Sequence, residues 1–207
     1  MANRIIVIGL LILFCVYTFA QAKVVVGYEG KWERNPNAYQ YCTHVINAFD
    51  IPSESNHTNN YFSDAFNITN AMNFTTQVHN SGNNIKAILG IGGENSAKDF
   101  FIISKNSVSM NAFINEIVDR VEKGNYDGVD IDWEIIENKH KPYFKEFMKE
   151  LRYELNRRSH NNPGDYLLTF SAHWNTPQYY SLSEVANYTD FCLLMGYDYN
   201  WDHWDNL

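Results

Sequence analysis

The chain has 207 residues and a formal net charge of −8, with 24 acidic side chains against 16 basic ones. This length is typical of one domain and is enough for a real hydrophobic core. The acidic balance argues against nucleic acid or an anionic membrane surface as a partner.

The first segment has the pattern of a secretory signal peptide. Arg4 precedes an apolar run over residues 5–20, and Ala20 and Ala22 fit the small-residue positions of a signal-peptidase site. The alternative is a membrane anchor, but the run of 16 residues is shorter than the ~20 that a span needs. We therefore predict a signal peptide over residues 1–22, a secreted protein and no membrane segment after cleavage.

Four Asn-x-Thr sequons agree with export, since this motif accepts N-linked glycans in secreted eukaryotic proteins. They begin at Asn56, Asn67, Asn73 and Asn187. Cysteine is scarce: after signal cleavage only Cys42 and Cys192 remain, so at most one disulfide is possible. We expect both to be buried free thiols.

Six short runs in the remaining chain have the composition of β-strands. Most are near-continuously apolar, as expected of parallel strands that are covered on both faces. The runs are KVVVGY (23–28), THVINAF (43–49), IKAILGIG (85–92), YDGVDIDWE (126–134), YLLTFSA (166–172) and DFCLLMGY (190–197).

Helical patterns separate several of these runs. Apolar residues recur at helical spacing over 110–121 and again over 144–155, where Pro142 sits at a first-turn position. The polar stretch 51–84 reads as a surface excursion with one helix near 63–79.

This alternation predicts an α/β fold with a parallel sheet, either open or closed into a (β/α)8 TIM barrel. Such a barrel takes ~250 residues and eight strands, whereas this chain supplies six strand candidates. If the fold is that barrel, about six βα units are present and two are missing, which leaves the sheet edges open. We expect a single partial domain over residues 23–207 that belongs to a longer protein.

The run DGVDIDWE (127–134) places four acids within eight residues, on what reads as a core strand. Side chains alternate along a strand, so Asp130, Asp132 and Glu134 share one face and the apolar residues between them share the other. Alternate residues lie ~6.8 Å apart, and neighbouring carboxylates in a partly dry place raise the pKa of at least one. A carboxylic acid that stays protonated near neutral pH can serve as a general acid. Glu134 lies nearest the carboxyl end of the strand, where barrels hold catalytic groups.

Three structural interpretations compete with catalysis. A solvated edge strand conflicts with Trp133 and the flanking apolar residues. A calcium loop matches Asp130-x-Asp132 only in part, because the glycine and the distant glutamate of that motif are absent. A buried acid network satisfied by backbone and tyrosine groups stays open, although buried charges need a reason to be retained.

DGVDIDWE resembles the D-x-x-D-x-D-x-E signature of glycoside hydrolase family 18, the chitinases and their relatives. Its four acidic positions are filled by Asp127, Asp130, Asp132 and Glu134. Other stretches agree in the expected order: MGYDY (195–199) is similar to the family's M-x-Y-D, and KAILGIGG (86–93) to its K-x-x-x-S-x-G-G. Gly90 stands where the family usually has that serine.

The resemblance implies substrate-assisted catalysis, in which the 2-acetamido carbonyl of the substrate is the nucleophile. Glu134 would protonate the glycosidic oxygen. Asp132 would hold the acetamido nitrogen and stabilise the oxazolinium intermediate, Asp130 would pair with Asp132, and Tyr197 would hydrogen-bond the acetamido oxygen. The subsite for the distorted sugar would be lined by Tyr28, Phe49, Met195 and Asp198.

The implied partner is chitin or another N-acetylglucosamine oligosaccharide. We expect no cofactor, no metal and a monomer: no His/Cys cluster has metal-ligand spacing, and His173 reads as a hydrogen-bonded neighbour. Trp174, Trp201 and Trp204 follow the last two strands and suit either sugar stacking or core packing.

Two alternatives stay open beside a chitin-cleaving hydrolase. One is a chitinase-like lectin that binds sugar without cutting it, and the other is an endo-β-N-acetylglucosaminidase that acts on glycans. Glu134 favours an enzyme, because inactive relatives typically lose the acid at this position.

Overall fold

Strands and helices alternate along the chain, as the sequence predicts. The computed structural model describes residues 23–31, 34–54, 61–82, 84–135, 137–159, 165–174 and 177–196, and the predicted signal peptide lies outside them. The strands are β1 (Val26–Gly30), β2 (His44–Asp50), β3 (Lys86–Gly92), β4 (Gly128–Asp132), β5 (Leu167–His173) and β6 (Phe191–Met195). The α-helices are α1 (Ile68–Asn80), α2 (Ala97–Ser104), α3 (Ser107–Lys123), α4 (Lys141–Arg158) and α5 (Leu182–Val185). Short 3₁₀ helices are η1 (Pro36–Tyr41), η2 (Asn138–His140) and η3 (Pro177–Tyr180).

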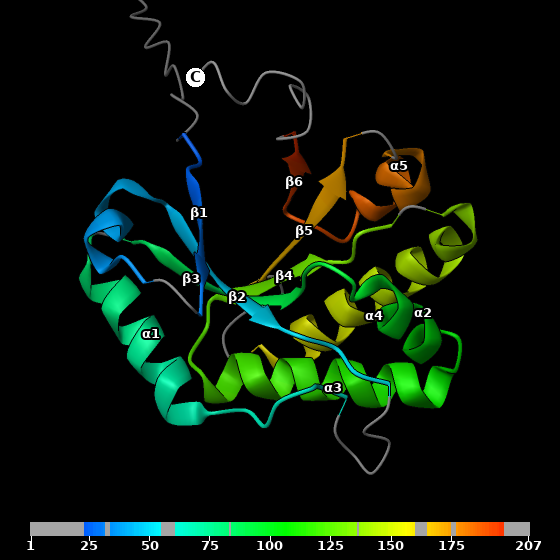
Figure 1. Cartoon of the computed structure of the whole chain (residues 1–207), viewed down its shortest axis with the longest axis horizontal. Coiled ribbons are helices and arrows are strands. Elements are labelled where there is room, and N and C mark those ends of the chain that lie inside the picture. The colour runs from blue at the N-terminus through cyan, green and yellow to red at the C-terminus, as the bar shows by residue number, and fades with distance from the viewer. Residues whose placement is uncertain are drawn as a thin grey trace, which may run out of the picture.

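The six strands form one sheet in the order β1-β2-β3-β4-β5-β6, and every neighbouring pair is parallel. The sheet is curved, with the helices on its outer face and the edge strands β1 and β6 on either side of an opening (Figure 1). Side chains meet across the concave side: His44 of β2 packs edge-on against Phe191 of β6, with ring centroids 5.3 Å apart. The chain is therefore an incomplete (β/α)8 barrel of six units, as predicted.

The hydrophobic core lies between the sheet and the helices. The outward side chains of β4 join it, and Trp133 just beyond β4 stacks on Phe100 of α2 with ring centroids 4.9 Å apart. The predicted apolar stripe of α3 is buried against the sheet, consistent with its helical spacing. Each large apolar side chain that is fully buried contributes about 1.5–3 kcal/mol.

Local capping explains where two of the helices begin. The Asn106 side chain accepts from the backbone amides of Val108 and Ser109, at 2.8 and 3.2 Å, and starts α3. The helix predicted near residues 63–79 is α1, which begins only after Asn67 because the side chain of Asn67 caps it. The sequence patterns did not predict α2, which has no side-chain cap.

Two expectations about the chain as a whole can be compared with the structure. None of the helices in the described part of the chain is long and apolar enough to cross a bilayer. Cys42 and Cys192 are free, as predicted, but neither is buried. The burial prediction is wrong because Cys42 lies in the connection between η1 and β2 and Cys192 lies on the edge strand β6.

Candidate active site

Strand β4 sends its side chains in two directions, as its alternating sequence predicts. Val129, Ile131 and Trp133 belong to the apolar cluster that packs against the helices. Asp130 and Asp132 point to the concave side of the sheet, where Asp130 meets side chains of β1 and β5. The acids therefore lie inside the partial barrel rather than on a solvated edge.

Asp130 is completely buried and holds two hydroxyl donors from different strands. The Tyr28 hydroxyl of β1 donates to its Oδ2 at 2.8 Å, and the Thr169 hydroxyl of β5 donates to its Oδ1 at 2.6 Å. Burial raises the pKa of Asp130 to about 6, although both hydrogen bonds lower it. The same burial and the charge of Asp130 raise the pKa of Tyr28, which keeps this phenol protonated as a donor.

Asp132 is nearly as buried but has fewer donors. Its Oδ1 atom is buried and has no hydrogen-bond partner within the described residues. Burial, together with the negative charges of Asp130 and Glu134, raises the pKa of Asp132 to about 7, although the Ser171 hydroxyl lowers it. The acid pair on β4 consequently holds a proton close to neutral pH.

Glu134 follows β4 on a short segment whose backbone is fixed by Tyr180. The fully buried Tyr180 hydroxyl accepts from the amide of Ile135 at 2.9 Å and lies 3.3 Å from the carbonyl oxygen of Trp133, to which it donates. These contacts hold the backbone on both sides of Glu134, whose half-buried side chain faces a cavity.

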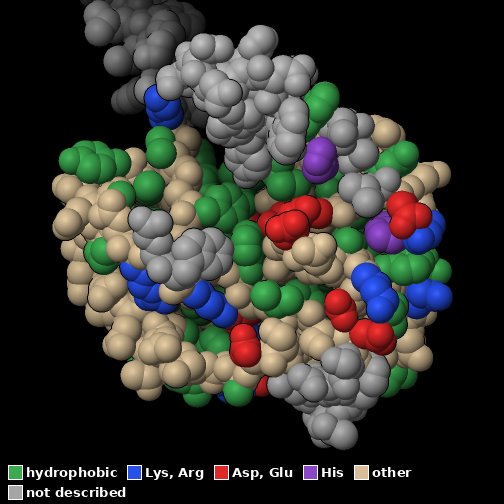
Figure 2. All heavy atoms as spheres, in the orientation of Figure 1, with side chains coloured by type: hydrophobic (Ala, Val, Ile, Leu, Met, Phe, Trp, Pro, Cys, Tyr) green, Lys and Arg blue, Asp and Glu red, His purple; other side chains and the backbone are tan. Residues whose placement is uncertain are grey.

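The cavity has a volume of about 640 Å³ and lies at the carboxyl ends of the strands. Five of the residues predicted for the site line it: Tyr28, Phe49, Asp132, Glu134 and Met195. Figure 2 shows acidic side chains gathered beside hydrophobic ones on the upper part of this face. Asp130 lies beneath this cavity rather than in its wall, because it is sealed by its hydroxyl donors.

Glycines of β3 let the neighbouring strands approach closely. A Cβ on Gly92, whose φ is +126°, would lie 2.1 Å from the carbonyl oxygen of Asp132. Gly90 pairs with Asp130, and a Cβ there would lie 2.9 Å from Ile46 Cγ2 and 3.1 Å from the ring of Phe49. The absence of a side chain at Gly90 thus makes room for Phe49 in the cavity wall.

The sequence model for Glycosyl hydrolases family 18 matches residues 24–206, which is nearly the whole chain. The chain belongs to glycoside hydrolase family 18. It is 28% identical to probable chitinase 2 of Drosophila melanogaster, a match that covers 87% of this chain and 41% of that protein. The chain spans less than half of the length of the curated relatives that it matches.

Solved structures of this family share the fold. The GH18 chitinase from Cycas revoluta, in complex with (GlcNAc)3, has a TM-score of 0.74 at 20% identity over 87% of this chain and 58% of its own. The chitinase-like agglutinin from Robinia pseudoacacia has a TM-score of 0.71 at 23% identity over 84% of this chain and 55% of its own. At these identities the likeness concerns the fold alone.

Asp127, the first acid of the family signature, lies away from the cavity. It precedes the amino end of β4, where it contacts His79 Nε2 at 2.7 Å, Lys86 Nζ at 3.0 Å and the amide of Ala87 at 2.8 Å. Its carboxylate ties α1, β3 and β4 together. The structure thus separates this member of the signature from the acids that face the cavity.

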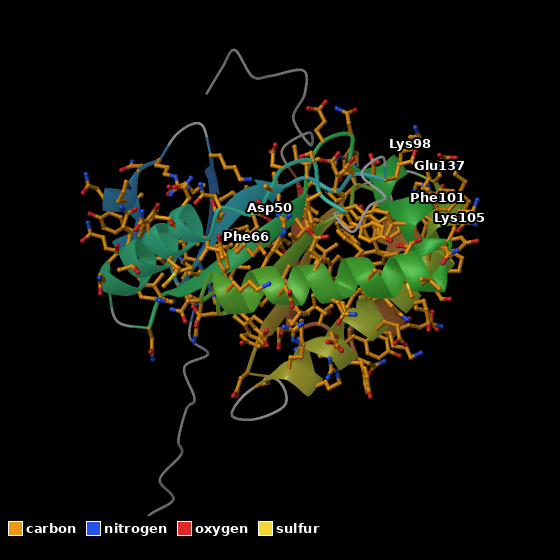
Figure 3. The ribbon with its side chains drawn as sticks, turned by 90° about the horizontal axis from the view of Figure 1, so that it is seen from below. Asp50, Phe66, Lys98, Phe101, Lys105 and Glu137 are labelled. Carbon is orange, nitrogen blue, oxygen red and sulfur yellow. The ribbon has the colours of Figure 1, made fainter. Side chains whose placement is uncertain are left out.

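A second cavity, of about 450 Å³, lies between α1 and β2 and contains none of the predicted site residues. Asp50 and Phe66 line it beside α3 (Figure 3). Asp50 is neutralised there by Lys31 at 2.7 Å and Arg120 at 2.5 Å. An acid paired twice in this way is a structural anchor, so the carboxylates with catalytic potential are those of the larger cavity.

Several site predictions fall on residues that the structure does not describe. They are Tyr197, Asp198, Trp201 and Trp204. Among the described residues, no group of three or more His, Cys, Asp or Glu side chains is arranged to hold a metal ion.

The sequence analysis missed three residues that shape the site: Thr169, Ser171 and Tyr180. A usable pattern was present for two of them, because Thr169 and Ser171 are polar residues at alternate positions of an otherwise apolar strand. Tyr180 gave no comparable pattern, since its role depends on backbone atoms of a distant segment.

Proposed function

We propose that the chain carries the acid machinery of a secreted glycoside hydrolase that cleaves β-1,4-linked N-acetylglucosamine polymers, most simply chitin. The observation that supports this most strongly is one cavity in which Glu134 faces solvent while Asp132 beneath it has a pKa near neutrality. Family membership supports a glycosidase, and the Cycas chitinase with bound (GlcNAc)3 supports an N-acetylglucosamine oligosaccharide as the ligand.

The first step of the proposed reaction breaks the glycosidic bond. Glu134 donates its proton to the glycosidic oxygen, and the leaving sugar departs with that proton. The carbonyl oxygen of the substrate's own 2-acetamido group bonds to the anomeric carbon, which forms a cationic oxazolinium ring. No enzyme carboxylate becomes bonded to the sugar.

Asp132 serves the intermediate by the negative charge that it gains when the proton shared with Asp130 passes to Asp130 as the oxazolinium forms. In the partly dry cavity, a carboxylate beside the oxazolinium and near the acetamido nitrogen stabilises the positive charge more than it would in water. Asp130 takes up this proton below it, so the net charge of the acid pair is unchanged, and Tyr197 would fix the acetamido oxygen. Water then attacks the anomeric carbon, Glu134 takes its proton, and the ring opens to the free acetamido sugar.

The remaining roles concern substrate placement and export. Tyr28, Phe49 and Met195 line the cavity with apolar surface suited to a sugar ring, and we assign Asp198 to the same subsite. Asn67, Asn73 and Asn187 are exposed sequon residues, which supports glycosylation of a protein that is secreted after loss of residues 1–22.

The experiment is turnover of a chito-oligosaccharide by the full-length product of the gene. We expect Glu134→Gln to lower kcat by ~10²–10⁴-fold, since that is the usual contribution of a general acid. The matched control is Glu137→Gln, because Glu137 is an exposed acid paired with Lys139 (Figure 3). Equal rates in wild type and Glu134→Gln would refute the role of Glu134.

A second candidate is a sugar-binding protein without activity, because the Robinia agglutinin has the same fold. Tight binding of a chito-oligosaccharide with no hydrolysis by the wild-type protein would favour it. A de-N-acetylated oligosaccharide separates the mechanisms further: it should not be cleaved if the acetamido group is the nucleophile.

A further inference from the structure

We propose that Thr169 is a positioning residue for the acid pair: its hydroxyl, together with that of Tyr28, keeps Asp130 ionised and assigns the shared proton to Asp132. This deepens the proposed function and rests on it for the consequence in turnover. The hydrogen bond and its effect on Asp130 do not depend on any activity.

The geometry at Asp130 supports this assignment. Thr169 is the register partner of Asp130 in the β4–β5 pairing, and both side chains are buried on the concave side of the sheet. Its hydroxyl donates to Oδ1 at 2.6 Å while Tyr28 donates to Oδ2 at 2.8 Å, so each carboxylate oxygen has one donor. Donors to a carboxylate favour its charged form.

The surroundings of Asp132 favour the opposite protonation state. One of its oxygens is buried without a hydrogen-bond partner in the described part of the chain, and it lies between the charges of Asp130 and Glu134. An acid that has few donors and negative neighbours keeps a proton longest. The proton therefore lies on the acid that lines the cavity, and the charge lies on the sealed acid beneath it.

Strand β3 cannot take over the role of Thr169. On β3, the partner of Asp130 is Gly90, and a Cβ there would lie 2.9 Å from Ile46 Cγ2 and 3.1 Å from the Asn47 carbonyl oxygen. A hydroxyl side chain on β3, of the kind the family signature has, would displace this packing. The donor on the other neighbouring strand thus supplies the contact.

The other titratable groups near Asp130 are few. Tyr28 of β1 is a donor whose own pKa is raised, and Asp132 is the only acid of its strand that interacts with it on the concave side. On β6, desolvation and the charge of Asp130 raise the pKa of Cys192, so this thiol stays neutral. None of these groups supplies a positive charge, so among the described residues the donors that stabilise the Asp130 anion are the hydroxyls of Tyr28 and Thr169.

The test compares Thr169→Val with Thr169→Ser by carbon-13 NMR titration of the aspartate carboxyl groups. Valine keeps the shape and removes the donor, whereas serine keeps the hydroxyl. We expect valine to raise the pKa of Asp130 by about one unit, as loss of one hydrogen bond to a charged group implies. Serine should leave it unchanged, and Asp130→Asn identifies the resonance.

Turnover provides the second measurement. We expect the acidic limb of the kcat/KM profile to move upward by about one pH unit in Thr169→Val and to return to its place in Thr169→Ser. If Thr169→Val does not fold, Tyr28→Phe removes the other donor and should shift the Asp130 titration in the same direction.

The outcomes distinguish this proposal from the proposed function. Identical Asp130 titrations in wild type, Thr169→Val and Thr169→Ser would overturn the role of Thr169, whatever the activity. If the wild-type protein does not hydrolyse chito-oligosaccharides and the valine variant still shifts Asp130, the proposed function fails and the role of Thr169 stands.

Discussion

The aspartates at the two ends of β4 have pKa values that are shifted in opposite directions. At the amino end, Asp127 accepts from His79, from Lys86 and from the amide of Ala87. Burial alone would raise its pKa, but these three donors outweigh burial and hold the pKa below the ordinary value. At the carboxyl end, burial raises the pKa of Asp132 to about 7, and no positive charge in the described part of the chain opposes it.

The difference lies in the donors that each neighbourhood provides, since both carboxyl groups are substantially buried. A carboxylate whose oxygen atoms are all paired stabilises the fold and is not available for catalysis. An acid that is buried with too few donors costs folding free energy, and such groups concentrate at functional sites. The two ends of one strand thus separate a structural carboxylate from a reactive one.

The largest expected effect is on activity. It is measured by replacing aspartate with asparagine at each end of β4 in turn. Asp132→Asn should lower kcat/KM for a chito-oligosaccharide by at least ~100-fold, because a neutral amide cannot stabilise a developing cation as a carboxylate does. Asp127→Asn should leave kcat/KM per folded molecule within about twofold, since Asp127 is remote from the cavity. Steady-state kinetics on both variants decides this, and an equal loss in the two would contradict the comparison.

A smaller effect is expected on the free energy of unfolding, and here the acid that matters is Asp127. Asp127→Asn should lower the free energy of unfolding by about 1–2 kcal/mol, because it removes the charge that pairs with Lys86 and His79 at a partly exposed site. Denaturant unfolding measures this, with Glu146→Gln as the control for an exposed ion pair. We expect the control to cost a few tenths of a kcal/mol at most, and a loss as large as that of Asp127→Asn would remove the distinction.

Much of this arrangement follows from sequence periodicity. The six strands and the two faces of β4 were predictable because side chains alternate strictly along a strand and because one face, with Trp133, is wholly apolar. Helix α3 was predictable from its stripe, while α2 was not: its eight residues are too few for a clear period.

The part that could not be predicted depends on register and on tertiary contacts. That Thr169 rather than Gly90 supplies a partner for Asp130 follows only once β4 is aligned with β5 and β3. The error over Cys192 has a similar origin, because an apolar strand looks buried in sequence even where it forms the edge of an incomplete barrel. The separation of Asp127 from the cavity likewise required knowing where β4 begins.

The smallest expected effect concerns the pH dependence of stability, and it tests the comparison without any substrate. Asp132 has a folded-state pKa raised from 3.8 to about 7, so its contribution to stability is most favourable at low pH and is lost as the pH rises through this window. Asp127 has a lowered pKa, so its contribution is present above the ordinary pKa and is lost only as the pH falls below it. Between about pH 5 and pH 8, the stability of wild type relative to Asp132→Asn should therefore fall by about 1 kcal/mol or more, while that relative to Asp127→Asn should change by less, because the lowered pKa of Asp127 itself lies below this range. Subtracting each variant from wild type cancels a histidine that neither acid influences, such as His140, whereas His44 cancels only for Asp132→Asn, because the charge of Asp127 raises the pKa of His44. Equal pH slopes for the two stability differences would mean that the pKa values of Asp127 and Asp132 are not shifted in opposite directions.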